Sequence, residues 1–219
     1  MLYKVRCRPA FAALFVTLNP GESITVKAGS IVSLDTGISL KTQVFGSWPL
    51  TLLRKCFGGE LLSVDQLSNS TDEPLTVVLG HSIMGDITPL DLSQGSICLQ
   101  PGVYLAHTSG VRVQNHWAGL SSWLAGDGLW KVKLKGKGRV FIGGYGGIIK
   151  KMVYGNFVVT QGNLLAHSPK LRLKYRREEE SVNIVVRAAK TKNQRSQGNL
   201  IYCQSRNLQG LIDYLRSLA

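Results

Sequence analysis

One pattern of apolar and polar positions occurs three times along the chain. Residues 24–40, 97–113 and 157–173 align without gaps, and each contains two short stretches in which apolar and polar residues alternate. A period of two is typical of a β-strand with one buried face. One glycine separates the two stretches in each copy: Gly29, Gly102 and Gly162. We interpret these glycines as structural turns, so the pattern predicts three strand–turn–strand units.

Three such units predict one β-domain with internal threefold pseudosymmetry, because a unit this small cannot bury its apolar face alone. We place the repeats at about 18–87, 88–149 and 150–219, within a single domain that covers residues 1–219. Gly198 lies 60 residues after Gly138, so residues 199–205 are expected to be the counterpart of 139–145. The fold class is therefore all-β.

The end of the chain has a different period. Leu208, Leu211, Ile212, Leu215 and Leu218 recur at spacings of three and four. This spacing places them on one face of a helix, so we predict a short amphipathic helix at the C-terminus that covers the β-domain or meets a neighbour.

Composition supports a packed domain in a reducing compartment. The chain has 219 residues, 44% of them hydrophobic, and 24 glycines, which suits a core joined by many tight turns. Its four cysteines lie far apart and form no Cys-x-x-Cys pair, so we predict small buried thiols in the cytoplasm or another reducing compartment. No apolar run is long enough for a transmembrane helix.

The net charge of +13 is concentrated in one half of the chain. Residues 1–130 contain eight Lys and Arg against nine Asp and Glu, whereas residues 131–219 contain 18 against four. In two segments basic and apolar residues alternate, which places all the cations on one face of a strand. If the two strands were equivalent in the pseudosymmetry, their basic faces would join. The candidate polyanion-binding residues are Lys131, Lys133, Lys135, Lys137, Arg139, Lys170, Arg172 and Lys174.

A basic face attracts phosphates and other anions through long-range electrostatics. The candidate partners are an acidic protein, an anionic membrane surface and nucleic acid; the alternative is a solvated face that maintains solubility. Stacking on single-stranded nucleic acid would need aromatic residues, and only Tyr175 lies within these segments. Residues 187–199 are polar and basic, and we predict a mobile loop there.

Candidate catalytic chemistry is sparse. His107 and His167 occupy equivalent positions in a repeated Leu-Ala-His, but Leu34 fills the third position and no carboxylate repeats beside them. We therefore predict no metal site and retain these two histidines as the metal candidates. Because no Gly-x-Ser-x-Gly elbow or carboxylate pair occurs, we predict a non-enzymatic protein with no catalytic residue and no cofactor. Residues 143–147 lack the ending of a phosphate-binding loop, so we interpret these glycines as a close backbone approach.

Five segments carry a resemblance to a known family: LNPGESITVKAGSIVSLD (18–35), SICLQPGVYLAH (96–107), GDGLWKVKLKGKGRVFIGGYG (126–146), GNFVVTQGNLLAHSPKLRLKY (155–175) and LIYCQSRNLQGLIDYL (200–215). Together they resemble the "altered inheritance of mitochondria" family, which comprises bacterial proteins of unknown function and a fungal mitochondrial relative. Thr160 and Asn163 depart from the Asp and His that members commonly carry.

The resemblance implies a β-structure like that of the tryptophan RNA-binding attenuation protein, double-stranded β-helix-like or barrel-like, in a homotrimer. It also implies no known enzymatic activity and, for a eukaryotic member, a mitochondrial location near the inner membrane. Combined with the charge, it favours a non-enzymatic oligomeric scaffold that contacts an acidic protein or an anionic membrane. The alternatives are a nucleic-acid-binding protein and a small-molecule or metal-binding β-barrel centred on His107 and His167.

Overall fold

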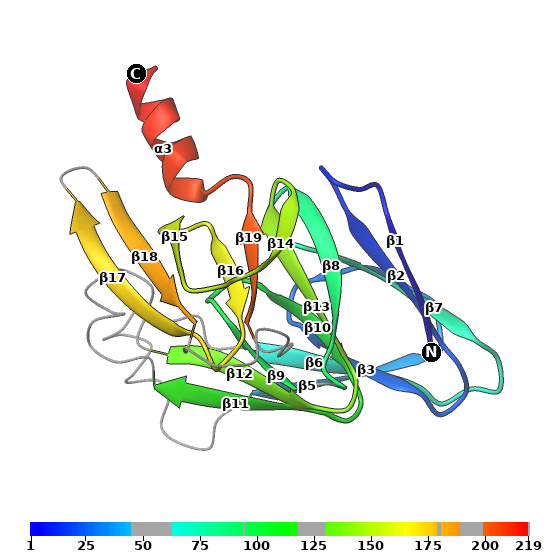
Figure 1. Ribbon diagram of the computed structural model, residues 1–219. Coiled ribbons are helices and arrows are strands. Elements are labelled where there is room, and N and C mark those ends of the chain that lie inside the picture. The colour runs from blue at the N-terminus through cyan, green and yellow to red at the C-terminus, as the bar shows by residue number, and fades with distance from the viewer. Residues whose placement is uncertain (45–62, 94, 118–129, 179–180, 189–198, 219) are drawn as a thin grey trace.

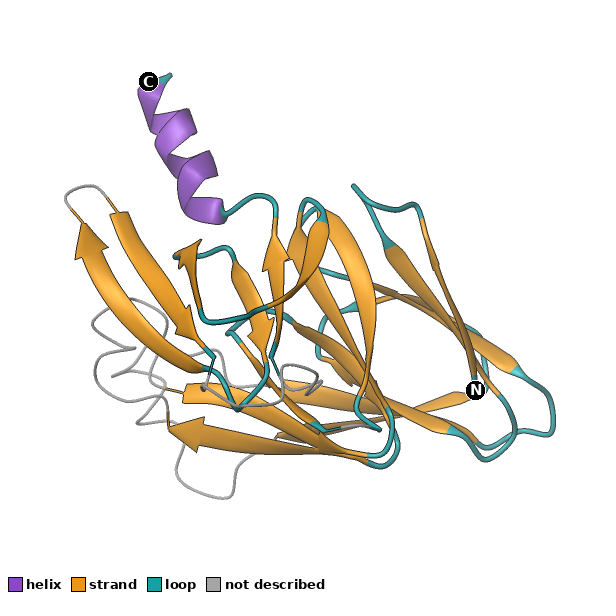
Figure 2. Cartoon of the chain, viewed as in Figure 1, coloured by secondary structure: helices purple, strands orange, loops and turns teal. Residues whose placement is uncertain are grey.

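The computed structural model describes residues 1–44, 63–93, 95–117, 130–178, 181–188 and 199–218 (Figure 1). Nearly all of the described elements are antiparallel strands, and a single helix, α3 (Leu208–Ser217), ends the chain (Figure 2). The predicted all-β class with a short C-terminal helix is therefore confirmed. The described strands form open sheets and no closed barrel, so the barrel-like form of the prediction is not confirmed.

The strands form four sheets, and strands that are distant in the sequence lie side by side in them. The first contains β1 (Leu2–Arg6), β2 (Ala13–Leu18), β7 (Leu75–Gly80) and β4 (Ile31–Leu34). The second contains β5 (Ile38–Val44), β6 (Ser63–Asn69), β3 (Ser23–Lys27), β10 (Tyr104–Thr108), β13 (Arg139–Tyr145) and β8 (Gly85–Asp91). The third contains β11 (Val111–Trp117), β12 (Trp130–Gly136), β9 (Ser96–Leu99), β16 (Leu164–His167), β19 (Leu200–Gln204) and β14 (Ile148–Met152). The fourth contains β15 (Asn156–Thr160), β18 (Ser181–Arg187) and β17 (Arg172–Glu178).

One pairing pattern underlies these sheets. Strands β2 to β7 form two groups of three, β4-β7-β2 and β3-β6-β5; strands β8 to β13 and β14 to β19 pair in the same way. The groups of successive units then join edge to edge, because β10 pairs with β3 and β16 pairs with β9. Residues 199–205 were expected to match 139–145, and β19 indeed pairs with β14 and β16 as β13 pairs with β8 and β10.

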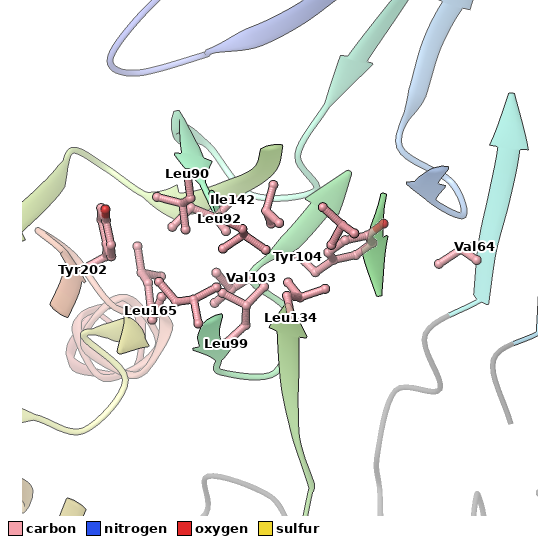
Figure 3. Close-up of a cluster of buried hydrophobic side chains, with 14 residues drawn as sticks. Val64, Leu90, Leu92, Leu99, Val103, Tyr104, Leu134, Ile142, Leu165 and Tyr202 are labelled. Atoms are coloured by element: carbon pink, nitrogen blue, oxygen red, sulfur yellow. The ribbon is translucent and has the colours of Figure 1, made fainter. Parts of the chain in front are cut away.

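Three apolar clusters lie between successive sheets. The cluster between the second and third sheets contains Tyr104, Leu134 and Ile142 (Figure 3). Ile142 and its neighbour Phe141 point into different clusters, so β13 is buried on both faces. A strand buried on both faces needs apolar or small residues at every position, which explains the continuous Val-Phe-Ile-Gly-Gly run. The third cluster, which includes Ile184 and Ile201, joins the third and fourth sheets.

Glycines shape the turns and the closest backbone contacts. Gly29, Gly102 and Gly162 follow β3, β9 and β15, and their φ angles of 77°, 79° and 81° are in the left-handed region that favours glycine. Within β13, a Cβ atom on Gly144 would lie 2.7 Å from Leu165 Cδ1, and one on Gly143 would overlap the His81 ring. The run of glycines at 143–147 therefore lies where other residues approach the backbone closely.

Helix α3 is fixed at its start and exposed along its length. Asn207 caps it, since the side-chain oxygen of Asn207 accepts a hydrogen bond from the Gly210 N–H at 2.6 Å. No residue of α3 is buried, and Leu208 and Leu215 are exposed. Residues 189–198 of the predicted basic loop lie outside the described residues.

Candidate basic interaction surface

Strand β12 separates its basic and apolar residues as predicted. Leu134 is fully buried and Val132 packs against the cluster between the second and third sheets. Lys133 and Lys135 point to the opposite face, where Lys133 is half-buried and Lys135 is exposed. The side chain of Lys131 lies outside the described residues. Neither Lys133 nor Lys135 forms an ion pair with a described residue.

The neighbouring strand β11 adds a cation to this face. Arg112 lies directly opposite Lys135 in the antiparallel ladder, and Gln114 lies opposite Lys133. Both β11 side chains are exposed. Like charges directly opposite each other on a sheet are destabilising. We call Arg112, Lys133 and Lys135 the basic ribbon, a site where an anion would relieve repulsion between the strands.

A second basic face lies on β17 and β18. Leu173 and Tyr175 of β17 pack toward the core between the third and fourth sheets, while Arg172 and Lys174 are exposed. Arg172 lies opposite the exposed Arg187 of β18, a second pair of like charges across a ladder. We call Arg172, Lys174 and Arg187 the basic edge. Lys170 is exposed in the turn that precedes β17.

The two basic faces are not equivalent in the repeated pattern. Strand β12 is the middle strand of its three-stranded group, whereas β17 is the outer strand of the following group. The two strands also belong to different sheets. The condition under which the two basic faces would join, equivalent positions in the repeat, is therefore not met, and each face is considered by itself.

Two further sequence candidates flank the basic ribbon. Lys137 is exposed in the turn after β12. Arg139 belongs to β13 of the second sheet, where its guanidinium lies 5.0 Å from the centre of the Tyr3 ring. It also lies opposite Asp91. Hydrogen bonds from Ser93, and secondarily the charge of Arg139, lower the pKa of the Asp91 carboxyl. Arg139 is thus engaged within the fold, outside the basic ribbon.

The buried His107 is hydrogen-bonded to Tyr104, which in turn is hydrogen-bonded to the backbone of Thr25. Its Nδ1 lies 2.6 Å from the hydroxyl of Tyr104, and that hydroxyl lies 3.2 Å from the carbonyl oxygen of Thr25. A carbonyl can only accept, so the hydroxyl donates to Thr25 and accepts the Nδ1–H of His107. Burial lowers the pKa of His107 to about 4 and raises the pKa of Tyr104. The imidazole is therefore neutral at pH 7.

His167 is also buried, on the third sheet, while His107 is on the second. The Nδ1–H of His167 donates to the carbonyl oxygen of Ser168 at 3.0 Å. Within the described part of the chain, no three His, Cys, Asp or Glu side chains group as metal ligands. The two histidines thus lie in separate sheets, each with its own hydrogen bond.

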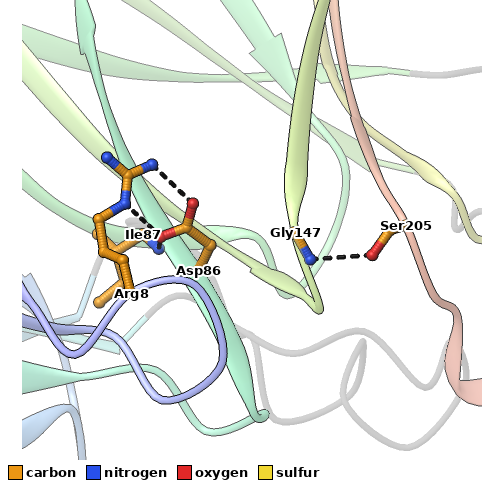
Figure 4. Close-up of polar contacts among 5 residues, drawn as sticks. All are labelled: Arg8, Asp86, Ile87, Gly147 and Ser205. Carbon is orange, nitrogen blue, oxygen red and sulfur yellow. Dashed lines mark hydrogen bonds and ion pairs between the residues drawn. The ribbon is translucent and has the colours of Figure 1, made fainter.

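One ion pair, between the exposed Arg8 and the buried Asp86, was not indicated by the sequence. The Arg8 guanidinium donates from Nε and Nη2 to the two carboxylate oxygens of Asp86, at 2.7 and 2.6 Å (Figure 4). The Ile87 N–H donates to the same carboxylate at 2.8 Å. The hydrogen bond that Arg8 donates to the Asp86 carboxylate raises the pKa of Arg8. The pair joins the loop after β1 to β8. Figure 4 also shows a second contact, in which the Gly147 N–H donates to Ser205 Oγ; the two atoms are 2.9 Å apart, and the bond joins the residue before β14 to the segment after β19.

An open all-β array with basic strand faces and structurally engaged histidines defines the class of this protein. The chain belongs to the mitochondrial biogenesis AIM24 family, whose model matches residues 3–206. Its fold is similar to the crystal structure of a Streptococcus pyogenes protein, with a TM-score of 0.75 and 21% identity over 100% of this chain and 99% of that one. A comparison with curated proteins gives no match. No described helix is long and apolar enough to cross a membrane.

Proposed function

We propose that this protein is a non-enzymatic, self-associating scaffold that binds an anionic membrane surface through its basic strand faces. The observation that carries the proposal is the two like-charge pairs that the ladder register sets opposite each other, Arg112 with Lys135 and Arg172 with Arg187. Such pairs cost stability in the isolated fold and become favourable when an anionic surface lies against them. The chain belongs to a family whose description refers to mitochondrial biogenesis, which is compatible with a role at an organelle membrane.

Two features favour a membrane over the nucleic-acid alternative. Tyr175, the aromatic residue within the basic segments, packs inward against the cluster that contains Ile184, as Leu173 does, and does not lie among the cations. Stacking on an aromatic side chain supplies much of the affinity for single strands, so the described basic faces supply charge without that contribution. The mitochondrial description of the family also points to a membrane-rich compartment.

The buried titratable groups support a non-enzymatic role. Asp86 is held by Arg8, and His107 is held by Tyr104. The Arg8–Asp86 pair joins the loop after β1 to β8, whereas Tyr104 and His107 are neighbours on the same strand, β10. Both contacts are made within the fold, which supports structural roles for these two groups.

The test is co-sedimentation with vesicles of phosphatidylcholine alone and with vesicles that also contain phosphatidylserine. The variant carries Lys133→Gln and Lys135→Gln, and the matched control carries Lys4→Gln and Lys41→Gln on other exposed strand positions. Each basic residue near an anionic surface contributes about 1 kcal/mol, so losing two weakens binding by roughly 30-fold. The control pair is expected to bind as the unmodified protein does.

Equal losses in both variants would show that net charge alone attracts the protein and would contradict a defined basic face. Equal binding to the two kinds of vesicle would refute the membrane proposal. Fluorescence anisotropy with labelled single-stranded RNA provides the comparison. Tight, steeply salt-dependent RNA binding without vesicle binding would favour the nucleic-acid alternative.

A further inference from the structure

Two edge strands lack the partner that their equivalents have in the interior. Strand β10 pairs with β3, and β16 pairs with β9, so each joins one three-stranded group to the next. By position in the repeat, β4 is the equivalent of β10 and β16, and β15 is the equivalent of β3 and β9. Yet β4 and β15 each end a sheet. Figure 1 shows the sheets that contain them at opposite ends of the molecule, so they do not meet within one chain.

Apolar residues that are buried in the interior copies are exposed on these two strands. Val32 of β4 is 67% exposed, whereas its equivalents Leu105 and Leu165 are 0% and 3% exposed. Val158 of β15 is 56% exposed, while its equivalent Cys98 is 6% exposed and its other equivalent, Thr25, is half-buried. The sequence thus has apolar residues at positions of β4 and β15 that are exposed to water in the isolated chain.

The same two strands also lack the usual protection against strand addition. The four sheets have eight edge strands in the described part of the chain. Natural edges carry charged residues or proline to prevent pairing with another chain. Six of the eight edges do so: Lys4 in β1, Lys41 in β5, Pro89 in β8, Arg112 in β11, Lys150 in β14 and Arg172 in β17. Strands β4 (Ile-Val-Ser-Leu) and β15 (Asn-Phe-Val-Val-Thr) contain neither.

We propose that β4 of one copy pairs antiparallel with β15 of a second copy. This pairing completes a sheet in the order β17-β18-β15-β4-β7-β2-β1, which matches the six-stranded order of the second and third sheets with β1 added. This inference rests on the proposed function, which includes self-association. It names the surface through which the protein self-associates, and the partner is a second copy of this chain. The interface uses backbone hydrogen bonds for affinity and the exposed apolar side chains for specificity.

The register of the interior junctions fixes the contacts. Ala106 lies opposite Val26 and His107 lies opposite Thr25, while Ala166 lies opposite Leu99 in the next junction. The equivalent pairs between copies are Ser33 with Val159 and Leu34 with Val158. A shift by one residue would turn the apolar side chains to the other face, so this register is specified by the side chains.

The proposed interface is head-to-tail because it joins two different strands. Each added copy presents a new free β4 or β15, so assembly continues until the array closes into a ring or extends as a filament. The basic edge on β17 and β18 belongs to the same completed sheet. Assembly would therefore repeat that cationic face at regular intervals and increase the avidity for an anionic membrane.

The experiment measures oligomeric mass by size-exclusion chromatography with light scattering across a range of protein concentrations. We expect the unmodified chain to assemble and Leu34→Lys and Val158→Lys each to give monomer, because either lysine charges one side of the paired edge. Ile149→Lys is the matched control, since Ile149 is 55% exposed on the edge strand β14. It should assemble like the unmodified chain.

A double variant, Leu34→Lys with Val158→Glu, places opposite charges across the proposed register and should restore assembly. Far-UV circular dichroism confirms that each variant is folded, and the two single variants test the two edges separately. Assembly that is unchanged in both single variants would overturn this interface while leaving self-association intact. A monomeric unmodified chain would refute self-association itself, and vesicle binding by that monomer would still support the membrane proposal.

Discussion

The buried pair of His107 and Tyr104 predicts that the protein loses stability as the pH falls below neutrality. The perturbation is a change from pH 7 to pH 5. Burial lowers the pKa of the folded His107 to about 4, whereas a histidine in the unfolded chain has its ordinary value near 6.5. Between these values the unfolded chain binds a proton that the folded chain does not, so protonation favours unfolding.

The magnitude follows from the difference between the two pKa values. The stabilisation is fully present above pH 6.5 and is lost as the pH falls through the folded pKa. One pKa unit corresponds to about 1.4 kcal/mol, so the free energy of unfolding decreases by about 2 kcal/mol at pH 5 and by about 3 kcal/mol at pH 4. This is a large part of the stability of a typical domain.

Urea unfolding at pH 7, 6 and 5 measures this loss in the unmodified protein and in His107→Gln. Glutamine keeps an amide N–H for the Tyr104 hydroxyl but has no proton to gain in this range. The variant should be less stable at pH 7 and should show a flatter dependence on pH. Parallel curves for the two proteins between pH 7 and pH 5 would refute the argument that burial keeps His107 neutral.

Two further predictions concern packing and the ion pair that Arg8 forms with the buried Asp86. Gly143→Ala should destabilise the protein and displace His81, whose Nε2 lies 2.9 Å from the Gly102 carbonyl oxygen, because the new methyl group overlaps the His81 ring. Gly147→Ala is the comparison, since the new Cβ would lie 3.8 Å from Ser205 Oγ, an ordinary van der Waals distance. Thermal unfolding should show a lower midpoint for Gly143→Ala and not for Gly147→Ala. Arg8→Ala should lower the free energy of unfolding by about 1–3 kcal/mol, because the buried Asp86 carboxylate loses its main partner. Urea unfolding at neutral pH measures this, and an unchanged urea midpoint would contradict the prediction.

The fold was largely predictable because its strongest features are local. Alternation with a period of two appears on β12, where Leu134 is buried and Lys135 is exposed. A glycine in the left-handed region follows β3, β9 and β15, where the repeated pattern predicts a turn. The pattern did not show that the array is open, because an open and a closed arrangement use the same strands and differ only in whether the last edges meet.

The candidate site was less predictable. The cations of β12 and β17 were visible in the sequence, but Arg112 was not, because it stands alone in a half of the chain with balanced charge. Its role arises from the ladder register that sets it opposite Lys135. Arg139 belongs to a basic segment of the sequence, yet its guanidinium lies over the Tyr3 ring, and its strand β13 is in a different sheet from the basic ribbon.

The sequence by itself determined the strand character, the turn positions, the C-terminal helix and the concentration of positive charge in the second half. The strands, turns and helix depend on how residue types are spaced over short stretches of the chain, and the charge depends on composition alone. Only the tertiary structure decided which side chains face each other, such as Arg8 and Asp86, which are 78 positions apart. It also decided that β4 and β15 remain unpaired edges. Strand order and register arise from long-range packing between sheets, and a period of two is equally compatible with many such arrangements.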